Sequence, residues 1–119
     1  MRVLLVEDDE VLAETVAILL RDDGVHVDVE HEGRRVIGAI AHRKPDVVVL
    51  DVSLKDMDGT VVASALRACW PEMPIIFATG SVDIEDIRRA WRDQRTVVLQ
   101  KPFEIETLMH TINAVTRTR

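Results

Sequence analysis

The stretch PDVVVLDVS (residues 45–53) sets a run of apolar residues between polar ones and closes that run with Asp51. An uninterrupted apolar run rich in β-branched residues, here residues 47–50, is typical of a strand buried on both faces of a sheet. Aspartate is a poor residue for an apolar core. The stretch therefore predicts a buried strand with a carboxylate at its carboxyl end.

Similar runs recur along the chain, with segments of helical spacing between them. The other expected strands are residues 3–6, 25–29, 75–78 and 97–99. Apolar residues three or four positions apart mark the first and last helices: Leu12, Val16, Leu19 and Leu20, then Ile105, Leu108, Ile112 and Val115. Five strand-helix alternations predict an α/β, doubly wound fold around a five-stranded parallel sheet.

Residues that start and stop helices agree with this division. Helix ends are expected at Gly24, at Lys44-Pro45-Asp46 and at Trp70-Pro71. Asp58 and Ser81 are candidate N-caps, and Pro102 suits an early position in the last helix.

Composition limits the class of protein. A chain of 119 residues suits one domain, and its formal net charge of -6 disfavours direct binding to nucleic acid phosphates. No apolar run reaches the roughly 20 residues of a membrane span. Cys69 is the only cysteine, so a reducing cytoplasm is the simpler location, and we expect Cys69 to serve packing.

Chemically active side chains gather where the predicted strands end. They are Glu7, Asp8, Asp51, Thr79 and Lys101. In doubly wound folds, ligands bind beyond the carboxyl ends of the strands. Adjacent carboxylates repel unless a cation neutralises them, and Mg²⁺ prefers such oxygen ligands. Lys101 and Thr79 would add an ammonium and a hydroxyl for a phosphoryl group, which makes Asp51 a candidate nucleophile. For Asp9 and Glu10 we prefer the simpler interpretation, that they cap the first helix.

Four segments, in this order, resemble the receiver domain of response regulators, the CheY-like family, over the whole chain. They are LLVEDD (residues 4–9), LDVSLKDMDG (50–59), FATG (77–80) and KPF (101–103). The resemblance implies strand order 2-1-3-4-5 and one receiver domain over residues 1–119, with no output domain in the chain. The FATG segment is also similar to an atypical group of receivers.

The resemblance also implies roles for individual residues. Asp51 would be the phosphoacceptor, and Mg²⁺ (or Mn²⁺) would bind Asp8, Asp51, the Ser53 backbone carbonyl and, through a water, Glu7. Thr79 and Lys101 would contact the phosphoryl group, and the Lys101–Pro102 bond would be cis. The donor would be a histidine kinase or a histidine phosphotransfer protein. A downstream protein would bind the helix at residues 82–91 and the surface of residues 96–115.

Several positions depart from the family pattern. Lys55 stands where proline is usual, which predicts a less rigid loop. Val98 stands where many receivers have a Tyr or Phe that changes rotamer on activation, so output by that coupling is in doubt. Gly80, Val82 and Gln94-Arg95 also differ from the common residues.

Large side chains outside the strand ends have simple interpretations. Half-buried packing is expected for Trp70 and Trp91, although Trp91 could instead anchor a partner. The four histidines, at positions 26, 31, 42 and 110, lie away from the predicted strand ends, and we expect solvated or locally bonded roles for them.

Two other functions stay open beside a phosphoaccepting signalling domain. A small aspartyl-phosphate phosphatase would need a second Asp where Ser53 stands and a cap for which the chain has no room. A phosphorylation-silent interaction module would be compatible with Val98 but not with the intact polar group. The sequence fits both a stand-alone regulator and a piece of a larger regulator or hybrid kinase.

Overall fold

The computed structural model describes residues 1–80, 84–92 and 95–117. Its elements are β1 (Arg2–Val6), α1 (Glu10–Asp22), β2 (His26–Glu30), the 3₁₀ turn η1 (Gly33–Arg35), α2 (Val36–His42), β3 (Val47–Asp51), α3 (Gly59–Cys69), β4 (Ile75–Thr79), α4 (Ile84–Ala90), β5 (Thr96–Gln100) and α5 (Ile105–Thr116). Each strand predicted from its apolar run is present, with its bounds shifted by at most one residue at either end.

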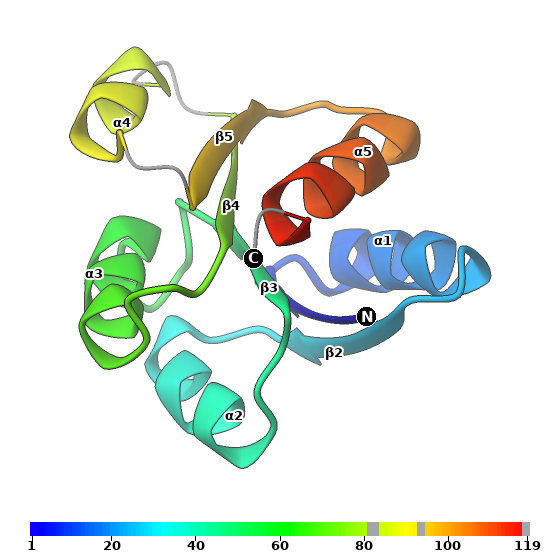
Figure 1. The fold of residues 1–119 in the computed structure, drawn as a ribbon, viewed down its shortest axis with the longest axis horizontal. Helices are drawn as coiled ribbons and strands as arrows, with labels where there is room; N and C mark the ends of the chain where they lie inside the picture. The colour runs from blue at the N-terminus through cyan, green and yellow to red at the C-terminus, as the bar shows by residue number, and fades with distance from the viewer. Residues whose placement is uncertain (81–83, 93–94, 118–119) are drawn as a thin grey trace.

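The five strands form one parallel sheet in the order β2-β1-β3-β4-β5, as predicted. Helices α1 and α5 cover one face, and α2, α3 and α4 cover the other (Figure 1). Every residue of β3 and β4 is buried, because these two strands lie inside the sheet and are covered on both sides. The uninterrupted apolar runs in the sequence have this physical origin.

Two apolar clusters fill the space between the sheet and its helix layers. One joins β-strand residues such as Phe77 and Val98 to α2, α3 and α4, and the other joins residues such as Val49 and Ala78 to α1 and α5. The sheet is thus packed on both faces, and its carboxyl-end edge is where polar groups can gather.

Most of the predicted helix boundaries are confirmed. Asp9 caps α1 by accepting from the Leu12 backbone N–H (3.0 Å), and Asp58 caps α3 by accepting from that of Thr60 (2.8 Å). Gly24 follows α1 with φ +84°, the left-handed conformation that glycine adopts without strain. The stops before Pro45 and Pro71 also hold, since α2 ends at His42 and α3 at Cys69.

Two predictions about local structure are wrong. Pro102 is not in α5, which begins at Ile105 with Glu104 as its N-cap, because the chain needs residues 101–104 to pass from the sheet edge to the helix layer. Cys69 is exposed rather than packed, because it is the last residue of α3, beyond the buried Leu66. The predicted N-cap Ser81 lies outside the described residues.

Among the described residues, no helix has the length and apolar character needed to cross a membrane.

Candidate functional site

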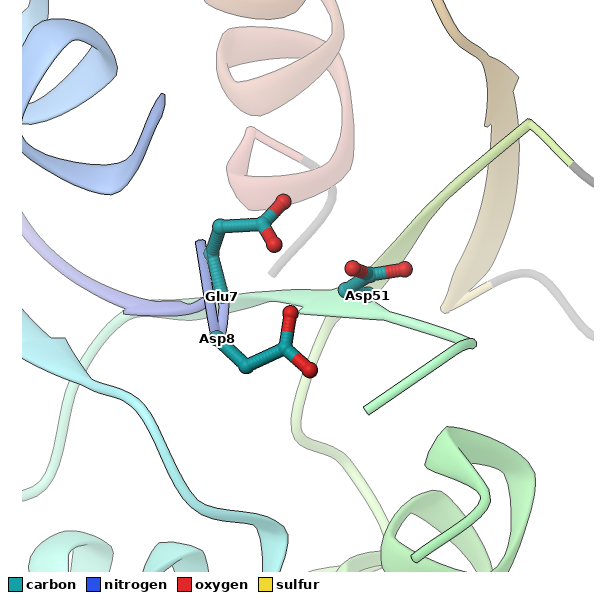
Figure 2. Close-up of side chains that lie close together, drawn as sticks. All are labelled: Glu7, Asp8 and Asp51. Carbon is teal, nitrogen blue, oxygen red and sulfur yellow. The ribbon is translucent and has the colours of Figure 1, made fainter. Parts of the chain in front are cut away.

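Three carboxylates meet at the carboxyl edge of the sheet. Strands β1 and β3 are parallel neighbours, with Val6 paired to Leu50, so Glu7 and Asp8 follow β1 beside Asp51 at the end of β3. One oxygen from each carboxylate lies within 4.8 Å of the others. Figure 2 shows Glu7 and Asp8 with their carboxylates on the side that faces Asp51. This donor set has the hard oxygen ligands and the spacing that suit a divalent cation such as Mg²⁺.

Lys101, which follows β5, brings a positive charge to the same cluster. Its Nζ lies 2.6 Å from Glu7 Oε1 and 3.4 Å from Asp51 Oδ2. Burial favours the neutral amine, but the hydrogen bond to Glu7 and the charges of Asp51 and Glu7 outweigh it, and the pKa of Lys101 is raised. Lys101 is therefore held as an ammonium between the two carboxylates.

Glu7 is the most deeply enclosed acid of the cluster, with 7% of its side chain exposed. Burial raises the pKa of Glu7, the hydrogen bond from Lys101 partly opposes this, and the Asp51 charge adds to the rise. The second carboxylate oxygen of Glu7 accepts from the Asp9 backbone N–H at 3.2 Å. The burial of Glu7 and its repulsion by Asp51 both disfavour the Glu7 carboxylate, and Lys101 is the main group that opposes them.

The position of Asp51 is fixed by its own loop. Its Oδ1 accepts from the Ser53 backbone N–H at 3.0 Å. Gly59 packs against the Asp51 backbone so closely that an added Cβ would lie 2.2 Å from the Asp51 carbonyl oxygen. Glycine at position 59 is therefore a structural requirement of the carboxyl end of β3, and the sequence motif alone did not reveal this role.

Thr79 ends β4, the strand next to β3, and is fully buried. Its carbonyl oxygen accepts from the Lys101 backbone N–H at 2.8 Å, which links the ends of β4 and β5. The Lys101–Pro102 bond is cis, as predicted. Thr79 and Lys101 are thus brought to the same edge of the sheet as Asp51.

The segment between Asp51 and α3 is attached to its surroundings by hydrogen bonds. The Lys55 backbone N–H donates to Asp8 Oδ2 at 2.7 Å. Asp56 accepts from the backbone N–H groups of Gly33 (2.9 Å) and Arg34 (3.0 Å) at the start of η1. The less rigid loop expected from Lys55 stays a prediction. The hydrogen bonds themselves could not be predicted from the sequence, because they join residues far apart in it.

The prediction that the histidines lie away from the strand ends is wrong for His31. This histidine directly follows β2, at a strand end, and its Nδ1 lies 2.8 Å from the Glu7 backbone oxygen. The expected locally bonded role is confirmed, but its partner belongs to the acidic site. No sequence pattern indicated this contact, because it depends on β1 and β2 being neighbours.

A cavity of about 400 Å³ opens beside the cluster. Glu7, Asp51 and Lys101 contribute to its wall, and the rest is mainly apolar, including Leu12 of α1 and Phe103 before α5. The polar groups therefore border a largely apolar space, where their electrostatic interactions are stronger than in bulk water.

On the opposite face of the sheet, an aromatic ring packs beside β4 and β5 from residue 91. Val98 is buried and pairs with Phe77 across β4 and β5. Trp91, just after α4, meets Phe77 edge to face, with ring centroids 5.2 Å apart and planes at 71°. Trp91 and Trp70 are both partly buried against the core, as predicted.

Comparison with known proteins identifies the family. Residues 3–113 match the model of the response regulator receiver domain. The chain belongs to this family. The same fold recurs in the receiver domain of NtrX from Brucella abortus, with a TM-score of 0.90, 26% identity and coverage of 98% of this chain and 99% of that one.

Longer relatives contain this receiver domain as one part. The probable transcriptional regulatory protein TcrX of Mycobacterium tuberculosis is 36% identical over 115 residues, which are 97% of this chain and 49% of that protein. The regulatory protein LuxO of Vibrio vulnificus is 34% identical over 113 residues, covering 95% of this chain and 25% of that protein. The chain thus spans about half or less of the length of these relatives.

Proposed function

We propose that residues 1–119 form a phosphoacceptor receiver domain, a signalling module rather than an enzyme, in which Asp51 accepts a phosphoryl group from a histidine kinase or histidine phosphotransfer protein. The observation that carries this proposal is the meeting of Glu7, Asp8 and Asp51 within 4.8 Å, with the Lys101 ammonium 3.4 Å from Asp51. Membership of the receiver family supports the same chemistry.

The proposed metal site uses the acidic cluster. Asp8, Asp51 and the Ser53 backbone carbonyl would hold Mg²⁺ (or Mn²⁺), and Glu7 would assist. A bound divalent cation would neutralise the cluster and lower the barrier to bringing an anionic phosphoryl group to a carboxylate.

The proposed transfer makes one bond and breaks one. A carboxylate oxygen of Asp51 forms a bond to phosphorus as the phosphorus–nitrogen bond of the donor phosphohistidine breaks, and the electron pair returns to the imidazole. Lys101, already held as an ammonium, would leave its pairing with Asp51 to neutralise a phosphoryl oxygen. The Thr79 hydroxyl would donate to another, which completes the positioning that phosphoryl transfer requires.

The proposed output is a change of partner binding. Phosphorylation adds charge at Asp51 and would bias the region from Thr79 to Trp91 between two arrangements. The surface of residues 82–91 and 96–115, as far as the structure describes it, would then bind or release a downstream protein. The acidic charge of the chain supports a protein partner over nucleic acid, and the single cysteine fits a cytoplasmic location.

Mass spectrometry after treatment with acetyl phosphate tests the proposal. We expect the mass to rise by one phosphoryl group in Mg²⁺ and not in a metal chelator, with the modification mapping to Asp51. Asp51→Asn, which keeps the size of the side chain, should take up no label. A wild-type protein that stays unlabelled in Mg²⁺ would instead favour a phosphorylation-silent interaction module.

A further inference from the structure

One backbone hydrogen bond connects the proposed metal site to the loop that follows Asp51. The Lys55 N–H donates to Asp8 Oδ2 at 2.7 Å, although the two residues are 47 positions apart. Asp8 is only partly buried, so its carboxylate would otherwise be free to rotate among rotamers. This bond restricts that rotation.

The donor itself is firmly placed. Two residues before Lys55, the Ser53 N–H donates to Asp51 Oδ1 at 3.0 Å. One residue after it, Asp56 accepts from the N–H groups of Gly33 and Arg34 at 2.9 and 3.0 Å. The Lys55 N–H is therefore fixed from both sides, against Asp51 and against the start of η1.

We propose that the Lys55 backbone N–H is a positioning group that orients Asp8 for a divalent cation. It engages one carboxylate oxygen and leaves the other for the cation, which is the usual arrangement of a metal-binding carboxylate with an outer hydrogen-bond partner. The inference rests on the proposed function, because it assumes that Glu7, Asp8 and Asp51 bind a metal ion. It adds that Lys55 contributes to the metal site through its backbone, while its side chain takes no part.

This role depends on the residue at position 55 having a backbone N–H. Every amino acid except proline supplies one, so the identity of the side chain is unimportant to the contact. Lys55→Pro removes the donor. Lys55→Ala is the matched control, because it removes the ammonium but keeps the N–H.

Isothermal titration with Mg²⁺, repeated with Mn²⁺, compares the three proteins. We expect Lys55→Pro to bind about tenfold more weakly than wild type, the lower end of the effect of removing an outer partner. Lys55→Ala should stay within about twofold, since an exposed charge contributes little. Equal or tighter binding by Lys55→Pro would overturn the inference, while absence of binding by the wild type would overturn the proposed metal site as well.

Amide hydrogen exchange in the wild-type protein gives an answer that needs no substitution. The Lys55 amide should be protected without metal and should stay protected in saturating Mg²⁺, because the hydrogen bond and the cation use different oxygens. Loss of that protection on adding Mg²⁺, with the Gly33 amide that donates to Asp56 as an internal reference, would show that the cation displaces the bond. That result would overturn the inference even if Lys55→Pro failed to fold.

Discussion

Two regions of the molecule are held together by different interactions. The first, called the edge here, is the charged group at the carboxyl ends of β1, β3 and β5. The second, called the flank, is the apolar packing between β4, β5 and the end of α4. At the edge, Lys101 is held between Glu7 and Asp51 by contacts of 2.6 and 3.4 Å between charged atoms. On the flank, Phe77 pairs with Val98 across the sheet and meets Trp91 edge to face, within one apolar cluster. At the edge the order comes from charged atoms in contact, whereas on the flank it comes from close packing of apolar side chains.

The charged edge and the apolar flank place different requirements on their residues. A charged site needs particular atoms at particular distances, so a replacement at Asp51 or Lys101 is expected to abolish or slow the proposed phosphoryl transfer. A packed cluster needs only volume and shape, so an aromatic ring can come from Trp91, just after α4, instead of from β5. The comparison predicts that substitutions at the edge impair phosphorylation, while substitutions on the flank impair stability.

After the complete loss of labelling expected for Asp51→Asn, the largest effect is expected for Lys101→Ala. Loss of the ammonium removes the charge that would neutralise a phosphoryl oxygen, and comparable losses of one stabilising donor slow reactions by about 10² to 10³-fold. The rate of labelling by acetyl phosphate in saturating Mg²⁺, followed by mass spectrometry, measures this effect. A rate within about threefold of wild type, in a variant with an unchanged circular dichroism spectrum, would remove Lys101 from the proposed mechanism.

Trp91→Ala should produce the opposite pattern. It removes the edge-to-face contact with Phe77 and half-buried apolar area, which predicts a loss of about 1–3 kcal/mol in the free energy of unfolding. Urea denaturation measures this loss, and Trp91→Phe, which keeps an aromatic ring, should lose less. The labelling rate should stay within about twofold of wild type. A labelling defect as large as that of Lys101→Ala would show that edge and flank are not separable.

The sequence predicted the fold and the edge better than the contacts between loops. Strand positions followed from local apolar runs, and the order of the strands followed from the family resemblance, so the meeting of Glu7, Asp8 and Asp51 could be anticipated. The contacts of His31 with Glu7 and of Lys55 with Asp8 could not, because backbone groups leave no mark in the sequence. Gly59 was visible in the motif, but its closeness to the Asp51 backbone is a property of the folded chain.

The exposure of Cys69 illustrates a second limit. Helical periodicity places residues 62, 66 and 69 near one face of α3, and the first two are buried. Cys69 is the last residue of the helix, where the chain turns toward Trp70, and a residue there is no longer covered by the sheet. Periodicity therefore predicts which side of a helix is buried, but not how far the cover extends.

Val98→Phe tests whether Trp91 already fills the space beside Phe77. Val98 is buried in a packed cluster, so a larger side chain should lower the free energy of unfolding by about 1–3 kcal/mol. The cost should be smaller in a Trp91→Ala background, because the space would be vacated, and urea denaturation of the two single variants and the double variant measures this coupling. Strictly additive losses would mean that positions 91 and 98 do not share a site.

The smallest expected effect is on the pH dependence of the free energy of unfolding, and it arises from Glu7 at the edge. The pKa of Glu7 is raised above 4.5, first by burial, so above pH 4.5 the unfolded chain releases a proton that the folded protein retains. The folded state then binds more protons than the unfolded state, and the free energy of unfolding falls as pH rises through this window. Glu7→Gln cannot titrate and should lack this fall. The raised pKa of Lys101 acts above pH 10.5, outside this window. The lowered pKa values of Glu32 and Asp56 make stability fall toward acid, but both proteins share these two groups, so their contribution cancels in the difference between wild type and Glu7→Gln.

Urea denaturation of wild type and Glu7→Gln, from pH 4.5 to 7 in a metal chelator, measures this effect. The quantity to compare is the slope of the free energy of unfolding against pH, not its absolute value in each protein. Parallel slopes would mean that Glu7 does not carry this pH dependence. Repeating the measurement in Mg²⁺ tests the edge against the flank. A cation that binds only the folded protein stabilises it most at pH values at which the carboxylates are ionised. The metal should therefore reverse the fall in wild type at neutral pH, and it should stabilise Trp91→Ala by the same amount, since the flank contributes no ligand to the proposed site.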